Sequence, residues 1–212
     1  MDDSLRGRQA GELIKVRPEM TPLKISTEQM IALHSFLAEA AAVGEDSLAE
    51  ITGCETEVEV QEIRATALSE FGESGLCLSD DLIAGVMGRL EGAMPGSLNL
   101  VLEPEEALLW ARLGSDGDPL KTFVSLGEAL LGGVATAIGG VLGKEASFAG
   151  ASLVEESELA MLVKTHAPSD TVVFSARMRI DARDEVFTAF SHLLIEPKYL
   201  AQLLSALSAA VH

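Results

Sequence analysis

The feature that most constrains this chain is an internal repeat: two diverged copies of one pattern follow each other at an offset of about 90 residues. Glycines, apolar residues and Ser-Asp pairs recur in the same order. After a small insertion, an apolar stretch that leads into Glu-Pro recurs as well. The aligned positions are Gly53 with Gly143, Val58 with Phe148, Ile63 with Leu153, Ser79-Asp80 with Ser169-Asp170, Arg89-Leu90-Glu91 with Arg179-Ile180-Asp181, and Leu100–Pro104 with Leu193–Pro197. The shared order predicts a tandem duplication rather than a set of independent modules.

Each copy is expected to open with a long helix followed by a strand. In the first copy, Ser26 and Gln29 have the spacing of a capping box. The apolar residues after them recur at helical spacing until the helix ends near Gly53. From Val58 to Ile63, apolar and polar residues alternate around a bulge, which predicts a half-buried strand.

A hairpin and a short helix complete the unit. The apolar runs Leu76–Leu90 and Gly96–Leu102 flank a turn-rich stretch at residues 91–96, which predicts a β-hairpin. Pro104 then stands where a first helical turn tolerates proline, and the helix that follows carries Trp110.

These elements predict an α+β fold. We expect two α-β-β-β units related by a pseudo-two-fold axis, with a shared sheet and two adjacent long helices. Residues 1–24 mix charges and prolines without periodicity, which predicts a flexible tail. Residues 25–212 then form one domain, with repeat one at about 25–117 and repeat two at about 118–212.

Charge excludes several classes of partner. The sequence has 33 Asp and Glu against 15 Lys and Arg, a formal net charge of -18. Such a chain repels phosphate backbones and anionic lipid headgroups, so we expect no binding to nucleic acid. Cys54 and Cys77 have no CxxC spacing and read as reduced thiols. Because the first residues also lack the apolar stretch of a secretory signal, a cytoplasmic location is expected.

One apolar stretch, Phe123–Leu142, has about the length needed to cross a bilayer. Glu128 lies within it, and its several glycines are typical of a helix packed tightly inside protein. We therefore expect a buried central helix without membrane insertion.

Side chains that could carry other chemistry are scattered. The four histidines show no metal-ligand spacing, and we expect them to be half-exposed. Ser125 lacks the preceding glycine of a nucleophile elbow and an obvious histidine partner. The pairing of Ser35 with Ser125 in the two copies would also fit a packing contact between the long helices. The sequence thus predicts no metal, no cofactor and no catalytic residue.

Two short segments carry a resemblance to a known family. Ala135-Thr136-Ala137-Ile138, followed by Gly143, resembles the long-helix segment of the CheC, CheX and FliM-middle-domain family of bacterial chemotaxis. The stretch EGAMPGSLNLVLEPEEAL at residues 91–108 is similar to the hairpin and following helix of that family. The resemblance covers about residues 26–207.

The resemblance implies a phosphatase motif that this chain has lost. In the phosphatases of the family, each active helix carries Glu-x-x-Asn: the Glu holds a lysine of a phosphorylated receiver, and the Asn orients the attacking water. A neutral amide can both donate to and accept from water beside an anionic phosphate, whereas a carboxylate only accepts. The motif positions fall on Ser35 and Ala38 in the first copy and on Ser125 and Glu128 in the second, and the sole asparagine is Asn99.

The sequence therefore predicts a chemotaxis or flagellar-switch protein that binds a CheY-like response-regulator receiver, mainly as a non-catalytic adaptor. A CheD-like or flagellar-switch protein is a further expected partner, Ser35, Ser125 and Glu128 are the expected binding residues, and Mg²⁺ enters only with the receiver. One alternative is a diverged CheC-type phosphatase in which Glu128 or a partner's group replaces the amide. Another is a structural or assembly module that binds no receiver.

Overall fold

The computed structural model describes residues 25–70, 84–114, 117–155, 168 and 170–210. The expected tail and the first part of the run Leu76–Leu90 lie outside these residues. In chain order the elements are α1 (Thr27–Thr52), β1 (Thr56–Ala67), the 3-10 turn η1 (Leu68–Glu70), β2 (Ala84–Gly92), β3 (Gly96–Leu102), α2 (Pro104–Ala111), α3 (Pro119–Leu142), β4 (Ala146–Glu155), β5 (Val172–Ala182), β6 (Glu185–Ile195) and α5 (Pro197–Ala210).

The two long helices end in the same way. α1 begins with the predicted capping box, in which the Gln29 N–H donates to Ser26 Oγ and the Ser26 N–H donates to Gln29 Oε1 at 2.9 Å. It ends at Gly53, whose φ of 67° is left-handed, and α3 ends at Gly143 with a φ of 62°. Glycine adopts this conformation at little steric cost, so both helices stop at equivalent positions.

The predicted strands and hairpin are also present. The register of β1 shifts between Val60 and Glu62, which confirms the bulge before Ile63. β2 and β3 form the predicted hairpin, although β2 continues to Gly92 and leaves a shorter turn than the sequence suggested. At the offset of the repeat, β1 and β4 begin at corresponding positions and β2 and β5 end at corresponding positions. After the small insertion, β3 and β6 end at corresponding positions and α2 and α5 begin at corresponding positions, although the other ends differ by two to six residues.

All six strands form one antiparallel sheet in the order β1-β5-β6-β3-β2-β4. Exchanging each strand for its counterpart in the other copy reverses this order and leaves it otherwise unchanged. The first strand of each copy therefore pairs with the hairpin of the other copy, and a pseudo-two-fold axis passes between β3 and β6. This arrangement confirms the predicted α+β fold with a shared sheet.

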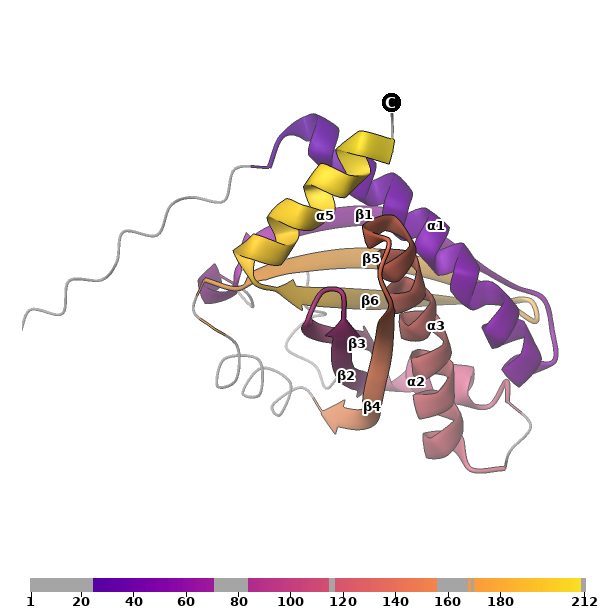
Figure 1. Cartoon of the computed structure of the whole chain (residues 1–212). Coiled ribbons are helices and arrows are strands. Elements are labelled where there is room, and N and C mark those ends of the chain that lie inside the picture. Colours follow the sequence, from indigo (N-terminus) through magenta and orange to yellow (C-terminus); the bar gives the residue numbers. More distant parts are fainter. Residues whose placement is uncertain (1–24, 71–83, 115–116, 156–167, 169, 211–212) are drawn as a thin grey trace, which may run out of the picture.

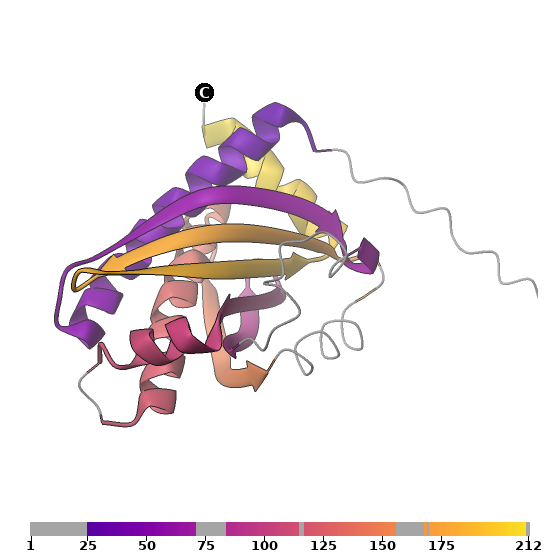
Figure 2. The same ribbon diagram turned by 180° about the vertical axis from the view of Figure 1, so that it is seen from behind.

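The helices α1, α3 and α5 lie on the same face of the sheet, as the two opposite views show (Figures 1 and 2). Their apolar side chains and those of the strands form one core. Trp110 of α2 is fully buried and packs edge to face against Phe123 of α3, with 6.0 Å between the ring centroids. α2 thereby closes one end of the core.

Glycine lets α1 and α3 approach closely. A Cβ on Gly133 would lie 2.7 Å from the backbone nitrogen of Gly44 and 3.1 Å from the carbonyl oxygen of Ala40. α3 is also long and apolar enough to qualify as a membrane span, with a mean hydropathy of 1.5, and half of the qualifying stretch is buried inside the protein. Contacts with α1, β2 and β4 account for that apolar composition, as expected for a central helix.

Candidate partner-binding site

The sequence-predicted binding residues lie on the two long helices. Ser35 of α1 is exposed and shares the outward side of the helix with Ile31, whose side chain is 62% exposed. On α3, Ser125 is half-buried and Glu128 is exposed. A partner that approaches these helices from the side that faces away from the sheet can reach Ser35 and Glu128 directly.

The structure does not bring the two serines together. α1 and α3 run in opposite directions and cross where Gly44 meets Gly133. Ser35 and Ser125 each precede the crossing by roughly two helical turns, which puts them on the order of 20 Å apart along the helices. The interpretation of this pair as a packing contact was wrong, because glycines and Ala40 make that contact. The two motif positions thus form two separate surfaces.

Glu128 borders a shallow groove of about 340 Å³ at the crossing of the long helices. Val43 and Ser47 of α1 form one wall, and the start of β4 closes the end. The hydroxyl of Thr136, also in the groove, donates to the Gly132 carbonyl oxygen at 2.9 Å. The carboxylate of Glu128 can accept hydrogen bonds from a cationic or amide group of a partner.

Asn99, the sole asparagine, lies in β3 and is fully buried. Its cross-strand neighbour is His192 of β6, and the two residues are also counterparts in the repeat, so they meet on the pseudo-two-fold axis. Among the described residues, neither atom of the Asn99 amide has a hydrogen-bond partner. An amide in this position cannot reach a bound protein.

His192 is 1% exposed, so the expectation of half-exposed histidines was wrong for this residue. Its Nδ1 lies 2.8 Å from the Ser175 hydroxyl oxygen, and burial lowers the pKa of its imidazole to about 4. His34 is half-buried as predicted, whereas His166 and His212 lie outside the described residues. The alignment that pairs Leu100–Pro104 with Leu193–Pro197 also pairs Asn99 with His192, a signal that could have revealed this polar pair.

Another titratable group, the carboxylate of Glu106, links two elements of the fold. The carboxylate of Glu106 in α2 accepts a hydrogen bond from the Thr188 N–H at 3.3 Å, which ties α2 to β6. Desolvation by burial raises the pKa of Glu106, and the hydrogen bond from Thr188 partly offsets that rise. Within the part of the chain that the structure describes, no three His, Cys, Asp or Glu side chains form a group that could hold a metal ion.

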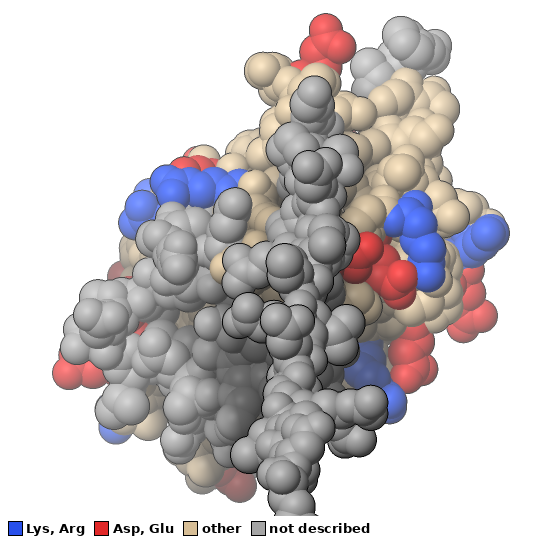
Figure 3. Space-filling model, turned by 90° about the vertical axis from the view of Figure 1, so that its left-hand side faces the viewer, with Lys and Arg blue, Asp and Glu red and all other residues tan. Residues whose placement is uncertain are grey.

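Charges of both signs lie near one another on the side of the molecule in Figure 3, while its upper part is mostly uncharged. The upper part of the molecule contains the start of α1 and the helix α5 (Figure 1), and α5 carries Lys198 as its sole charged residue. Among the described residues visible on this side, the acidic side chains are therefore not gathered into one patch.

No protein-family model matches the chain, and no curated protein matches its sequence. Solved structures do match. Thermotoga maritima FliY superimposes with a TM-score of 0.70 at 13% identity, over 88% of this chain and 99% of the solved FliY chain. FliM of H. pylori, solved in complex with SpeE, has a TM-score of 0.60 at 13% identity, over 88% of this chain and 97% of the solved FliM chain. FliM in the H. pylori FliG–FliM complex has a TM-score of 0.58 at 13% identity, over 85% of this chain and all of the FliM chain in that structure.

The architecture is therefore the CheC-like fold of FliY and the FliM middle domain, which confirms the predicted resemblance at the level of the fold. The match covers nearly the whole of each of these structures.

Proposed function

We propose that this protein works in the chemotaxis or flagellar-switch apparatus of the cytoplasm, where it binds a phosphorylatable CheY-like receiver and acts mainly as a non-catalytic adaptor. The likeness to FliY and FliM supports the broader role, because it extends over most of this chain and nearly all of those structures.

The position of the sole asparagine supports a non-catalytic role for this protein. A phosphatase of this fold needs an amide on an exposed helix to orient water, whereas Asn99 is 0% exposed within a central strand. The exposed motif positions instead hold Ser35 on α1 and Glu128 on α3. These surfaces can bind a partner without supplying the group that the hydrolysis requires.

Glu128 opposes hydrolysis if its carboxylate faces the phosphoryl group. Two unit charges of the same sign about 4 Å apart repel by roughly 4 kcal/mol at an effective dielectric constant near 20. A penalty of that size in the transition state corresponds to about a thousandfold in rate. A diverged phosphatase therefore needs an amide or a cation from the partner near Glu128, with Mg²⁺ supplied by the receiver.

A second candidate function is assembly without receiver binding, in contact with a CheD-like or flagellar-switch protein. It is favoured by the FliM structures, in which a domain of this fold is bound to FliG or to SpeE. In this candidate, the outer surfaces of the long helices bind a structural protein instead of a receiver.

The test is a binding titration against phosphorylated and unphosphorylated chemotaxis receivers, with phosphate release measured in the same samples. The adaptor predicts tighter binding to the phosphorylated form and an unchanged rate of release. Ser35→Arg and Glu128→Arg are expected to weaken binding at least tenfold, while the matched control Ser205→Arg, at an exposed serine of α5, leaves it unchanged. Faster release that Glu128→Ala alters identifies the phosphatase, and no binding to any receiver identifies the assembly module.

A further inference from the structure

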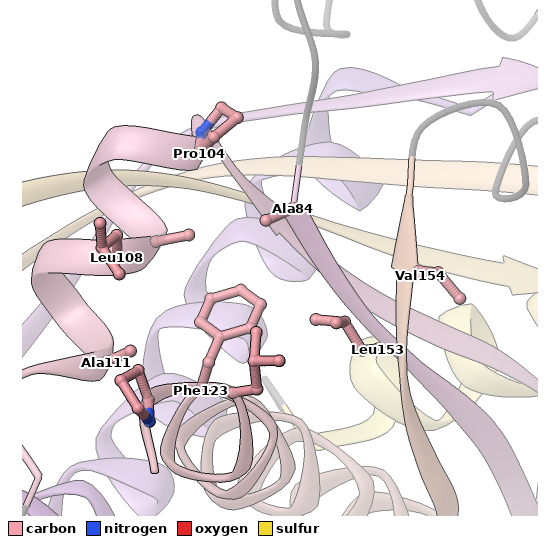
Figure 4. Close-up of a pocket in the computed structure, with 10 residues that line it drawn as sticks. Ala84, Pro104, Leu108, Ala111, Phe123, Leu153 and Val154 are labelled. Carbon is pink, nitrogen blue, oxygen red and sulfur yellow. The ribbon is translucent and has the colours of Figure 1, made fainter. Parts of the chain in front are cut away.

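An apolar hollow of about 460 Å³ lies at the end of the sheet, away from the groove beside Glu128. Its walls come from α2, the first turns of α3, the start of β2 and the end of β4 (Figure 4). The lining residues are Ala84, Pro104, Ala107, Leu108, Ala111, Pro119, Leu120, Phe123, Leu153 and Val154. A hollow of this size and composition can hold large apolar side chains.

The second copy of the repeat shows why the hollow exists. Ala84, at the sheet wall, corresponds to Phe174, which is 3% exposed and belongs to the core. Ala107 and Ala111 of α2 correspond to two buried leucines of α5, Leu200 and Leu204. Three alanines in the first copy thus replace one phenylalanine and two leucines in the second copy, and the difference in side-chain volume leaves space.

The equivalent groove in the second copy, between α1 and α5, has a different character. It is smaller, about 390 Å³, and none of its lining residues comes from the sheet, because Phe174 occupies that position in the core. Its lining includes the amide of Gln29 and the hydroxyls of Ser205 and Ser208. The apolar hollow that reaches the sheet is therefore particular to the first copy.

Three leucines around the hollow are unusually exposed. The side chains of Leu108, Leu120 and Leu153 are 45%, 63% and 40% exposed, and they come from α2, α3 and β4. Single exposed apolar residues are ordinary on a protein surface, but three around one apolar hollow indicate a contact surface. Figure 4 shows Leu108, Leu153 and Phe123 arranged around the same space.

In the part of the chain that the structure describes, β4 is the edge strand of the sheet beside the hollow. Among the described residues, β4 pairs with β2 alone, and Ala146–Val154 contains no charged side chain. The opposite edge, β1, carries Glu57, Glu59 and Glu62, the kind of charges that keep an edge strand from pairing with another chain. An extended segment that pairs with β4 lies beside Leu153 at the margin of the hollow.

The charge of the chain and of the residues near the hollow indicates which kind of segment binds there. The chain has a net charge of -18, so a second copy of it brings like charge to the surface. Near the hollow, α2 and the start of α3 carry more acidic than basic residues; these are Glu103, Glu105, Glu106 and Asp118 against Arg112 and Lys121. A basic segment of another protein is therefore favoured over a second copy.

We propose that this hollow is a docking site for an extended, basic segment of a partner protein, which pairs with the edge of β4 and inserts a phenylalanine or leucine side chain beside Phe123. The inserted side chain takes the place that Phe174, Leu200 and Leu204 fill in the second copy. This site does not depend on receiver binding, because it lies on different residues from Ser35, Ser125 and Glu128.

The test uses two synthetic peptides, acetyl-KKVFVLK-amide and its acidic counterpart acetyl-EEVFVLE-amide, titrated into the full chain while leucine methyl NMR signals are followed. The basic peptide is expected to shift the methyl signals of Leu108, Leu120 and Leu153 and to bind at least ten times more tightly than the acidic one. Ala84→Phe fills the hollow with the residue found in the second copy, and it is expected to weaken peptide binding at least tenfold.

Leu120→Asp is a second variant that leaves the core intact, and it is also expected to weaken peptide binding at least tenfold. Its matched control is Ile31→Asp on α1, because the two side chains are 63% and 62% exposed. Equal binding by Leu120→Asp and Ile31→Asp, or no binding of the basic peptide at millimolar concentration, overturns the proposal. The proposal is also overturned if sedimentation shows that the native protein is a dimer and Leu120→Asp is a monomer, because the hollow then binds a second copy of the chain. Receiver binding by Leu120→Asp stays unchanged in every case, which separates this test from that of the adaptor.

Discussion

The contact between the long helices gives a sharp prediction at two adjacent glycines. In Gly133→Ala the new methyl group would lie 2.7 Å from the Gly44 nitrogen and 2.9 Å from the Gly44 Cα. Both are backbone atoms, so the helices must move apart, at a cost near the upper end of the 1–3 kcal/mol typical of overpacking, about 3 kcal/mol. The higher helix propensity of alanine stabilises the helix by about 1 kcal/mol relative to glycine, so the free energy of unfolding should fall by about 2 kcal/mol in total.

Gly132→Ala is the matched control, because nothing lies within 4 Å of a Cβ at that position of the same helix. It gains the same propensity without the clash, so its free energy of unfolding should rise by about 1 kcal/mol. The two variants therefore differ by about 3 kcal/mol, or about 6 to 12 °C in Tm for a domain of this size. Thermal and urea unfolding measure both quantities. If Gly133→Ala is as stable as Gly132→Ala, the close approach of α1 to α3 is wrong.

Three further predictions concern buried polar groups and a helix cap. Asn99→Leu should stabilise the protein by about 1–2 kcal/mol in urea unfolding, because it removes an amide that is buried without a partner among the described residues; a loss of stability would show that the amide is hydrogen-bonded. His192 has a folded-state pKa of about 4 against about 6.5 when unfolded, so its neutral form contributes stability that is complete above about pH 6.5 and is lost as the pH falls towards 4. Between pH 7 and pH 4, the free energy of unfolding of the native protein should therefore fall by about 3 kcal/mol more than that of His192→Gln, and parallel curves for the two proteins would contradict the assignment. Ser26→Ala should cost about 1 kcal/mol, with its effect confined in hydrogen exchange to the first turns of α1, and unchanged exchange there would refute the cap.

Short-range sequence features were sufficient to predict the helices and strands of this fold. The capping box at Ser26 and the terminal glycines Gly53 and Gly143 set the helix ends through short-range hydrogen bonds and backbone conformation, which a sequence displays directly. The bulge after Val60 was visible as a break in alternation. Element types and most boundaries could therefore be predicted.

The pairing of strands could not be predicted in the same way. The alternation in β1 fits pairing with β2 of its own copy as well as it fits pairing with β5 of the other copy. Long-range packing decides between these arrangements, because the close contact of α1 with α3 holds the two copies together. A shared sheet was predicted from the repeat, but the exchange of first strands was seen only in the structure.

The candidate site was predictable in position and less so in environment. Helical spacing placed Ser35 and Glu128 on the long helices, but the antiparallel crossing that separates Ser35 from Ser125 depends on Gly44 and Gly133. His192 lies in β6, where residues 189 to 195 are all buried, and a strand of this kind does not alternate in a way that reveals one exposed face. The alignment of Ala84 with Phe174 shows that a small side chain stands where the other copy has a large one. Only the packed structure shows that this difference leaves an apolar hollow.

The most direct test of the account is the lifetime of the phosphoryl group on a bound receiver, measured with this protein at a concentration that saturates binding. The account predicts that the phosphorylated receiver binds and that its phosphate is lost at the rate of the receiver alone. A lifetime shortened tenfold or more would contradict it and show that this protein speeds hydrolysis of the aspartyl phosphate without a helix-borne asparagine.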